Sequence, residues 1–171
     1  EAESPPMGEP NAFLEEALFK ARTILLTGGI DFKQAKRVCE RLLALSSANP
    51  KEPILLVISS PGGHVESGDM IHDMIKFVAA PVKVLGTGWV ASAGALIYSA
   101  AKKENRFALK NTRFLLHEPR GGVGGQATDV EIQAREILKM RERLNQIFAD
   151  ATGKSLEQIK KDTDRDFWMS A

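Results

Sequence analysis

The stretch Thr-Gly-Trp-Val-Ala-Ser-Ala-Gly-Ala, residues 87–95, says the most about the fold and function of this chain. It lies between two apolar runs and therefore predicts a junction between a strand and a helix. Gly88 and Gly94 permit a tight turn, from which the Ser92 hydroxyl would project beside the first amides of the helix. Ser92 is thus a candidate nucleophile. The alternative is a packing contact between small residues, with Ser92 serving only as a helix N-cap.

The composition is that of a globular domain with a core of its own. The chain has 171 residues, of which 43% are hydrophobic and 26% charged, and a formal net charge of +1. So small a charge gives no electrostatic reason to bind nucleic acid, and the apolar runs are too short to span a membrane. The single cysteine, Cys39, excludes an internal disulfide and fits a helix core in a reducing compartment.

Strand and helix patterns alternate along the chain, which predicts an α/β domain with right-handed crossovers. Residues 1–12 hold three prolines and are predicted to be a mobile N-terminal segment, and residues 13–171 to form one domain. The run at 54–58 is continuously apolar, as in a strand buried on both faces. The predicted strands are 23–27, 54–58, 82–86, 107–109 and 113–116, and the predicted helices begin near residues 13, 31, 64, 92, 128 and 155.

Helix starts are indicated where a Ser, Thr or Asp precedes a Gln or Glu by three residues. Gly153 is placed to end the long helix that runs through Asp150, whose outer face is charged. The capping patterns are Asp31 with Gln34, Thr128 with Glu131, and Ser155 with Gln158.

A nucleophilic serine needs a base, and the base needs an orienting carboxylate. His117 ends an apolar strand, which is where α/β sheets present catalytic groups; a structural role is the alternative. His64 and His72 are expected to be surface or capping residues. The carboxylate candidates are Asp162, Asp164 and Asp166, among which spacing does not choose; the alternative is a solvated acidic turn.

Two glycine-rich turns complete the candidate features. The turn at 61–63 provides backbone N–H groups suited to a developing oxyanion, or is simply a turn. The turn at 121–125 lacks both the lysine-serine ending of a Walker loop and the spacing of a dinucleotide-binding fingerprint. Phosphate binding is therefore not expected, and no cysteine or histidine spacing predicts a metal site.

Five segments together resemble one known family, the proteolytic subunit of the Clp protease, ClpP. The resemblance spans about residues 19–171 and implies a ClpP/crotonase-like spiral of repeated β-β-α units, with a long protruding handle helix at about 127–151. The segments are SSPGG at 59–63, ASAG at 91–94, LHEP at 116–119, QATDVEI at 126–132 and DTDRD at 162–166.

This resemblance implies a role for each site residue. Ser92 matches the nucleophile, His117 the general base, and Asp166 the third member of the triad. The backbone amides of Gly63 and Ala93 match the oxyanion donors. The segment containing Gly121, Gly122 and Val123 resembles the edge that pairs with an extended substrate.

The resemblance also implies how such a subunit works. Seven-membered rings stack as a tetradecamer around a closed chamber, into which an AAA+ Clp ATPase such as ClpX, ClpA or ClpC threads unfolded polypeptides. This implies a serine endopeptidase of protein quality control. The resemblance implies a bacterial-type cytoplasmic location, with an organellar location as the alternative. It also implies that this chain has no cofactor and that neither nucleic acid nor a membrane is a partner.

The chain departs from the family pattern in three places. Trp89 and Ala93 stand where glutamine and methionine are usual, which would alter the substrate pocket. The stretch before residue 13 lacks the usual axial-loop residues, and the chain stops at Ala171, before the family's usual final strand and tail. A non-catalytic ring subunit is one alternative; a crotonase-fold acyl-CoA enzyme is another, but it leaves the Ser-His-Asp set unexplained.

Overall fold

A computed structural model describes residues 12–119 and 124–171 of the chain. Of residues 1–12, which were predicted to be mobile, residues 1–11 lie outside this range, and Ala12 is the first residue of a helix. The predicted substrate-pairing segment of Gly121, Gly122 and Val123 also lies outside this range.

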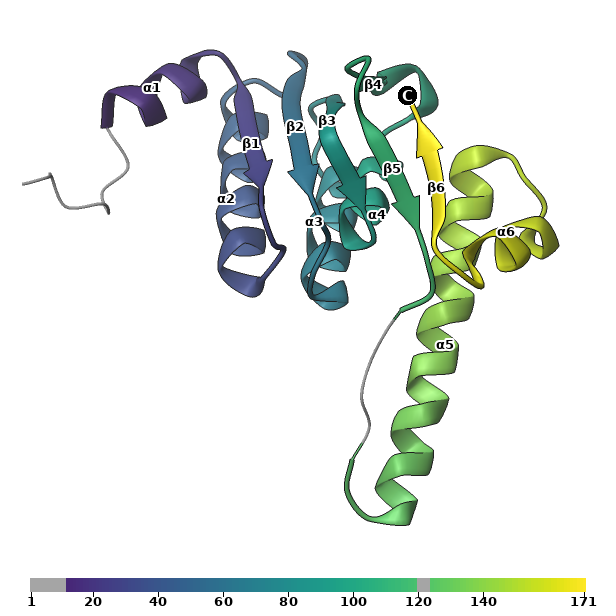
Figure 1. The fold of residues 1–171 in the computed structure, drawn as a ribbon. Helices are drawn as coiled ribbons and strands as arrows, with labels where there is room; N and C mark the ends of the chain where they lie inside the picture. Colours follow the sequence, from purple (N-terminus) through teal and green to yellow (C-terminus); the bar gives the residue numbers. More distant parts are fainter. Residues whose placement is uncertain (1–11, 120–123) are drawn as a thin grey trace, which may run out of the picture.

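The described chain builds one six-stranded sheet, in which β1-β2-β3-β5-β6 lie in that order and β4 pairs with β3 (Figure 1). All of these pairings are parallel except β5 with β6, which is antiparallel. The strands are β1 (Thr23–Thr27), β2 (Ile54–Ser60), β3 (Val82–Ala91), β4 (Arg106–Ala108), β5 (Arg113–Leu116) and β6 (Phe167–Ser170). All five predicted strands are present, and β6 is a strand that the sequence did not predict.

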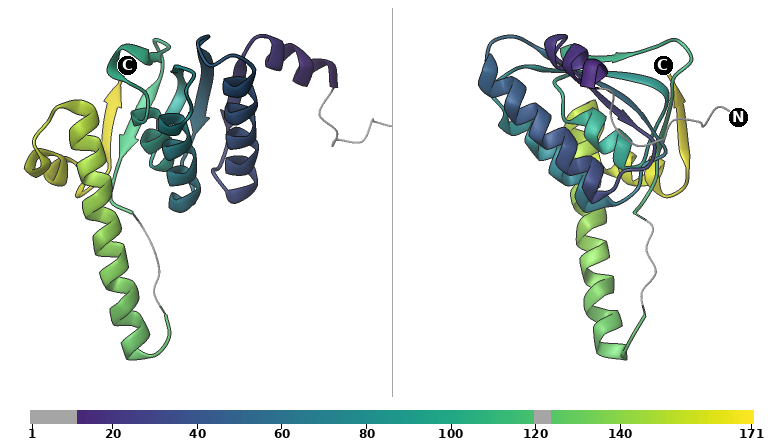
Figure 2. Two further views of the ribbon diagram at one scale, coloured as in Figure 1. Left: turned by 180° about the vertical axis from the view of Figure 1, so that it is seen from behind. Right: turned by 90° about the vertical axis from the view of Figure 1, so that its left-hand side faces the viewer.

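Helices α2, α3 and α4 cover one face of this sheet, and α5 extends beyond its edge (Figure 2). The long helix predicted from residue 128 to 150 is α5. The helices are α1 (Ala12–Lys20), α2 (Phe32–Ala48), α3 (Val65–Phe77), α4 (Ala93–Ser99), α5 (Ala127–Thr152) and α6 (Leu156–Thr163), with a 3₁₀ turn η1 (Lys103–Asn105).

Because helices cover only one face, the inner strand β2 is buried on one side only. Ile54, Leu56 and Ile58 are fully buried, whereas Leu55 and Val57 between them are partly exposed. The prediction of burial on both faces is therefore wrong. A continuous apolar run also fits a strand whose second face is apolar but uncovered.

The predicted helix caps are confirmed at two of three places. The carboxylate of Asp31 accepts the Gln34 amide hydrogen at 2.7 Å, and α6 has the same arrangement at Ser155. The predicted cap at Thr128 is wrong, because α5 begins at Ala127 and its N-cap is Gln126, two residues before Thr128. Gly153 ends α5 in the left-handed conformation as predicted.

Cys39 is a core residue of α2, as the helical pattern predicts. It is 3% exposed, and burial raises the pKa of its thiol to about 11. A thiol so held stays protonated near neutral pH, so Cys39 acts as a small apolar side chain.

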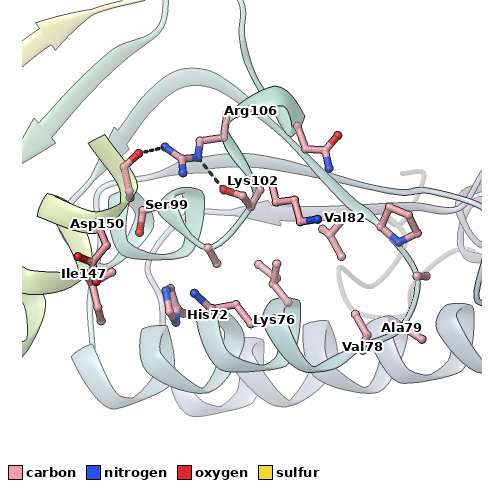
Figure 3. Close-up of a pocket in the computed structure, with 17 residues that line it drawn as sticks. His72, Lys76, Val78, Ala79, Val82, Ser99, Lys102, Arg106, Ile147 and Asp150 are labelled. Atoms are coloured by element: carbon pink, nitrogen blue, oxygen red, sulfur yellow. Dashed lines mark hydrogen bonds between the residues drawn. The ribbon is translucent and has the colours of Figure 1, made fainter. Parts of the chain in front are cut away.

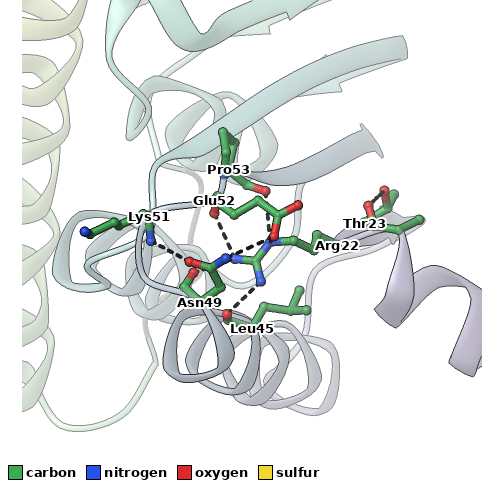
Figure 4. Close-up of polar contacts among 8 residues, drawn as sticks. Arg22, Thr23, Leu45, Asn49, Lys51, Glu52 and Pro53 are labelled. Carbon is green, nitrogen blue, oxygen red and sulfur yellow. Dashed lines mark hydrogen bonds and ion pairs between the residues drawn. The ribbon is translucent and has the colours of Figure 1, made fainter.

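Arg22 has a polar role that no sequence pattern predicted: it joins β1 to the end of α2 (Figure 4). Its guanidinium donates to four backbone carbonyls at 2.8–3.2 Å. Two of them, those of Leu45 and Asn49, belong to the C-terminal end of α2, and the Leu45 carbonyl also accepts the Asn49 amide hydrogen at 3.1 Å. Arg22 therefore closes that helix end and ties it to the turn before β2. The acceptors are the carbonyls of Leu45, Asn49, Glu52 and Pro53.

We expect Arg22→Ala to lower the free energy of unfolding by about 2–3 kcal/mol, because buried carbonyls lose a charged donor. Backbone strain at the positive φ of 50° should be the same in the parent protein and the variant, because alanine also carries a Cβ atom. Urea denaturation at equal protein concentration measures the change. The control is Arg37→Ala, whose 3.5 Å ion pair with Glu15 is exposed and supplies less than about 1 kcal/mol. Equal losses in the two variants would contradict this role.

Candidate active site

Ser92 lies between β3 and α4 with its backbone in a strained conformation. Its φ of 54° and ψ of −120° fall outside the regions that non-glycine residues favour. Its side chain makes no capping hydrogen bond to α4, so the N-cap alternative does not account for the hydroxyl. A strained turn from strand to helix is the geometry that exposes a nucleophilic serine in α/β hydrolases.

An irregularity in the sheet precedes this turn. The pairing of β2 with β3 shifts between the pair Ile58–Gly86 and the pair Ser60–Val90. Gly88 lies within the shifted segment at a φ of 63°, a conformation that glycine adopts without strain. Such bulges re-aim the residues that follow them, which here are the residues leading to Ser92.

The turn after β2 packs directly against Ser92. A Cβ atom built on Gly62 would lie 2.6 Å from Cβ and 3.1 Å from Oγ of Ser92, so no side chain fits there. The Gly62 amide donates to Ser60 Oγ at 3.0 Å, which fixes the turn.

The two predicted oxyanion donors, the amides of Gly63 and Ala93, lie in segments next to Ser92. Ile30 bonds to Gly62 and His64 on either side of Gly63, at 2.9 and 2.8 Å. The Gly63 N–H therefore points away from Ile30, because successive N–H groups alternate along extended backbone. Ala93 is the first residue of α4, where amides have no acceptor within the helix. Ala93 follows Ser92 in the sequence, and Gly63 follows Gly62, which packs on Ser92. Both predicted oxyanion donors therefore lie near Ser92.

The strand register brings the remaining candidates to the same edge of the sheet. Ala91 pairs with Leu115, and the Ser92 amide donates to the Leu115 carbonyl at 2.9 Å. Leu116 pairs with Phe167 as the last pair of the antiparallel β5–β6 ladder, so His117, which follows β5, and Asp166, which precedes β6, lie at the same end of this strand pair. The backbone thus gathers the segments of all three predicted triad residues.

The His117 ring itself is partly buried. Its Nδ1 lies 2.6 Å from the carbonyl oxygen of Glu118 and is held by that contact. Glu118 in turn forms an ion pair with Arg141 of α5, Nε to Oε1 2.9 Å, which the sequence did not suggest. The segment after β5 is therefore fixed to the long helix.

Register separates Asp166 from the other two aspartates. Asp162 lies within α6, where the Lys154 ammonium and the Gln158 amide donate to it, and the hydrogen bond from Lys154 lowers the pKa of its carboxyl. Asp164 is exposed and pairs loosely with Arg165 at 3.9 Å. Neither of them adjoins β6, whereas Asp166 directly precedes it.

The other two histidines have structural roles. His64 is the N-cap residue of α3, and its Nδ1 lies 2.8 Å from Ser67 Oγ. His72 is 5% exposed and contacts Asp73 at 2.9 Å. The prediction of a surface position for His72 is wrong, because α3 turns that side chain toward α4 and α5.

A pocket of about 550 Å³ lies away from this edge, where α3, α4 and α5 end (Figure 3). Arg106 spans it and donates to the carbonyls of Ala101 and Ala151, both at 2.7 Å. Helix C-termini carry partial negative charge, so Lys76, Lys102 and Arg106 complement the helix ends. The positions of these three cations are therefore explained by the helix ends that they complement.

The described part of the chain holds no cluster of three or more His, Cys, Asp or Glu side chains placed to bind a metal ion. Among those same residues, every helix is too short or too polar to cross a membrane.

Comparison with known proteins agrees with this geometry. The profile of the family described as "Clp protease" matches residues 8–171. The "ATP-dependent Clp protease proteolytic subunit 3" of Rhizobium etli is 58% identical over 166 residues, covering 97% of this chain and 84% of that protein. The "ATP-dependent Clp protease proteolytic subunit 2" of Pseudomonas aeruginosa is 54% identical over 164 residues, covering 96% of this chain and 81% of that protein.

A solved structure gives the same result. A mutant of ClpP1 from Listeria monocytogenes superposes with a TM-score of 0.86 at 54% identity, covering 92% of this chain and 88% of that one. The chain belongs to the Clp protease family, a family of serine peptidases. The resemblance seen in the sequence and the ClpP/crotonase-like fold that it implied are thereby confirmed.

The close packing of Gly62 on Ser92 can be tested by substitution. We expect Gly62→Ala to lower peptidase kcat by about a hundredfold, because a methyl group at φ 96° would displace the Ser92 turn. Gly29→Ala is the matched control, since a Cβ there meets nothing within 4 Å. Peptide hydrolysis by assembled protein of both variants is the measurement. A Gly62 variant as active as the Gly29 variant would show that this packing does not hold Ser92.

Proposed function

We propose that this chain is a serine endopeptidase subunit of an ATP-dependent Clp protease and that Ser92 is its nucleophile. One observation carries the proposal: the strained Ser92 turn lies at the end of the sheet where β5 leads into His117 and Asp166 leads into β6. The names of the relatives, proteolytic subunits of ATP-dependent Clp proteases, support the substrate class.

The proposed reaction is acyl transfer through a covalent intermediate. His117 takes the proton of the Ser92 hydroxyl as its oxygen attacks the peptide carbonyl carbon, and then gives that proton to the leaving amine. The amides of Gly63 and Ala93 bind the oxygen that becomes negative, and each such donor is worth about a hundred- to a thousandfold in rate. Water, deprotonated by His117, then releases the acyl group from Ser92. The reaction needs no cofactor in this chain.

Asp166 is proposed to orient the His117 ring. Its carboxylate would accept a hydrogen bond from Nδ1 and so leave Nε2 free to act as the base. In the present structure Nδ1 is held by the Glu118 carbonyl. Engagement of Asp166 therefore requires the ring to change its partner, a small movement that substrate binding or assembly would favour.

We also propose that the subunit assembles into rings of seven, stacked as a tetradecamer. Large apolar side chains are exposed on strands and helices of the subunit, and their burial between neighbouring subunits would favour self-association. They include Leu25, Phe77, Phe107, Ile132 and Leu138, each at least 46% exposed.

A closed chamber would explain how such an enzyme spares folded proteins. An AAA+ Clp ATPase such as ClpX, ClpA or ClpC would unfold substrates and deliver them in extended form. The edge containing Gly121, Gly122 and Val123 would pair with them by adding a strand. We place this activity in protein quality control in the bacterial cytoplasm.

Replacing the proposed nucleophile gives the direct test of activity. We expect Ser92→Ala to abolish cleavage of a short fluorogenic peptide, because no other group would form the acyl intermediate. The variant should assemble like the parent protein, since the Ser92 side chain makes no capping bond to α4. Equal peptidase activity in both proteins would remove Ser92 from the mechanism.

A paired substitution tests the choice of carboxylate. We expect Asp166→Asn to lower kcat by roughly ten-thousandfold, because the amide favours the wrong tautomer of His117. Asp164→Asn is the control, as its exposed carboxylate lies two residues away and should affect kcat little. Inactivation by the Asp164 change, with an active Asp166 variant, would reverse the assignment.

A further inference from the structure

Two buried polar side chains join α5 to α6 close to the proposed triad. Asn145 of α5 is 3% exposed and lies among the apolar side chains Leu144 and Phe148. Thr163, the last residue of α6, is 1% exposed, and its Oγ1 lies 2.9 Å from Asn145 Oδ1. Burying polar groups in an apolar core costs free energy unless they are hydrogen-bonded. The pair therefore fixes the position of α6 against α5 more specifically than apolar packing would.

Counting protons assigns the orientation of the Asn145 amide. The Thr163 hydroxyl lies 2.9 Å from two acceptors, Asn145 Oδ1 and the Ile159 carbonyl, but has one proton to donate. Asn145 Nδ2 is buried with no partner among the described residues. If the amide is turned over, Nδ2 donates to Thr163 Oγ1, and Oγ1 donates to Ile159. This orientation forms two hydrogen bonds instead of one.

The same threonine holds the backbone beside the proposed base. The Thr163 carbonyl accepts the Glu118 amide hydrogen at 3.0 Å. The carbonyl of Glu118 is the partner of His117 Nδ1 at 2.6 Å. Asp166 follows Thr163 by three residues, at the turn into β6. One residue thus fixes both the segment that carries His117 and the approach to Asp166.

We propose that Asn145 and Thr163 are positioning residues for catalysis. The hydrogen-bonded pair holds α6 on α5, and Thr163 then sets where the His117–Glu118 segment lies relative to Asp166. The Arg141–Glu118 ion pair supplies a second tie from α5 to the same segment. This inference rests on the roles proposed above for His117 and Asp166.

The test compares two substitutions at Thr163 in the assembled full chain. Thr163→Val has the same shape without the hydroxyl, and we expect kcat for a fluorogenic peptide to fall about 10- to 100-fold. KM should change less than about twofold, because the substrate contacts remain. Thr163→Ser keeps the hydroxyl and should retain kcat within about threefold. Parent kcat in the valine variant, or equal losses in both variants, would overturn the proposal.

Ile159→Val is the matched control, since Ile159 is a buried α6 side chain outside the hydrogen-bonded pair. It should lower the melting temperature without lowering kcat. If Thr163→Val does not assemble, Asn145→Leu decides, because it removes the amide and leaves Thr163 bonded to Ile159. An assembled Asn145→Leu protein with parent kcat would also overturn the proposal.

The Ser92→Ala protein separates the two levels of inference. If it is inactive while Thr163→Val keeps parent kcat, only the positioning role fails. If Ser92→Ala remains active, the proposed function itself fails, whatever the Thr163 variants do.

Discussion

The positive-φ backbone at Ser92 is the constraint on which the site depends. A serine does not adopt this conformation unless its surroundings impose it, at a cost of about 1–3 kcal/mol. Here the strand before it is clamped between β2 and β5, and the Ser92 amide is bonded to Leu115. Gly62 fills the space beside it so closely that only a glycine fits. The sheet and the Gly62 turn therefore hold Ser92 in this strained conformation.

The site is assembled from segments that are distant in sequence, and polar contacts set their relative positions. The parallel pairs align Ser92 with the end of β5, and the antiparallel β6 returns the chain so that Asp166, just before β6, lies at the same end of the sheet as His117, just after β5. Apolar packing holds α5 and α6 against each other, but it allows small sliding movements between the two helices. The buried bond between Asn145 and Thr163 opposes such sliding. Catalytic geometry would then depend on a helix that also extends away from the sheet.

Local signals in the sequence predicted much of the fold. β1 and β5 have the predicted bounds, and the caps at Asp31 and Ser155 form because each oxygen meets an amide three residues on. The cap at Thr128 failed, since nothing in a four-residue pattern says which turn of a helix is the first. β6 was missed because Phe167–Ser170 is a strand only through its pairing with β5, far back in the sequence.

The predictions for the site divide in the same way. Ser92 was identifiable because a hydroxyl among small residues at a strand-helix junction has a local geometric meaning. The choice among the three aspartates needed the β5–β6 register or the family resemblance, as spacing carries no such information. Asn145 and Thr163 were not singled out, because a polar residue on a helix is usually solvated and only the packing of α6 buries this pair.

If the proposed mechanism holds, Ser92 is an activated nucleophile in an assembled particle. Labelling with a fluorophosphonate probe, followed by peptide mapping on protein of known oligomeric size, measures that reactivity. We expect one modified residue per chain, Ser92. Modification at a different residue, or no labelling in a fully assembled particle, would contradict the mechanism and favour a non-catalytic subunit.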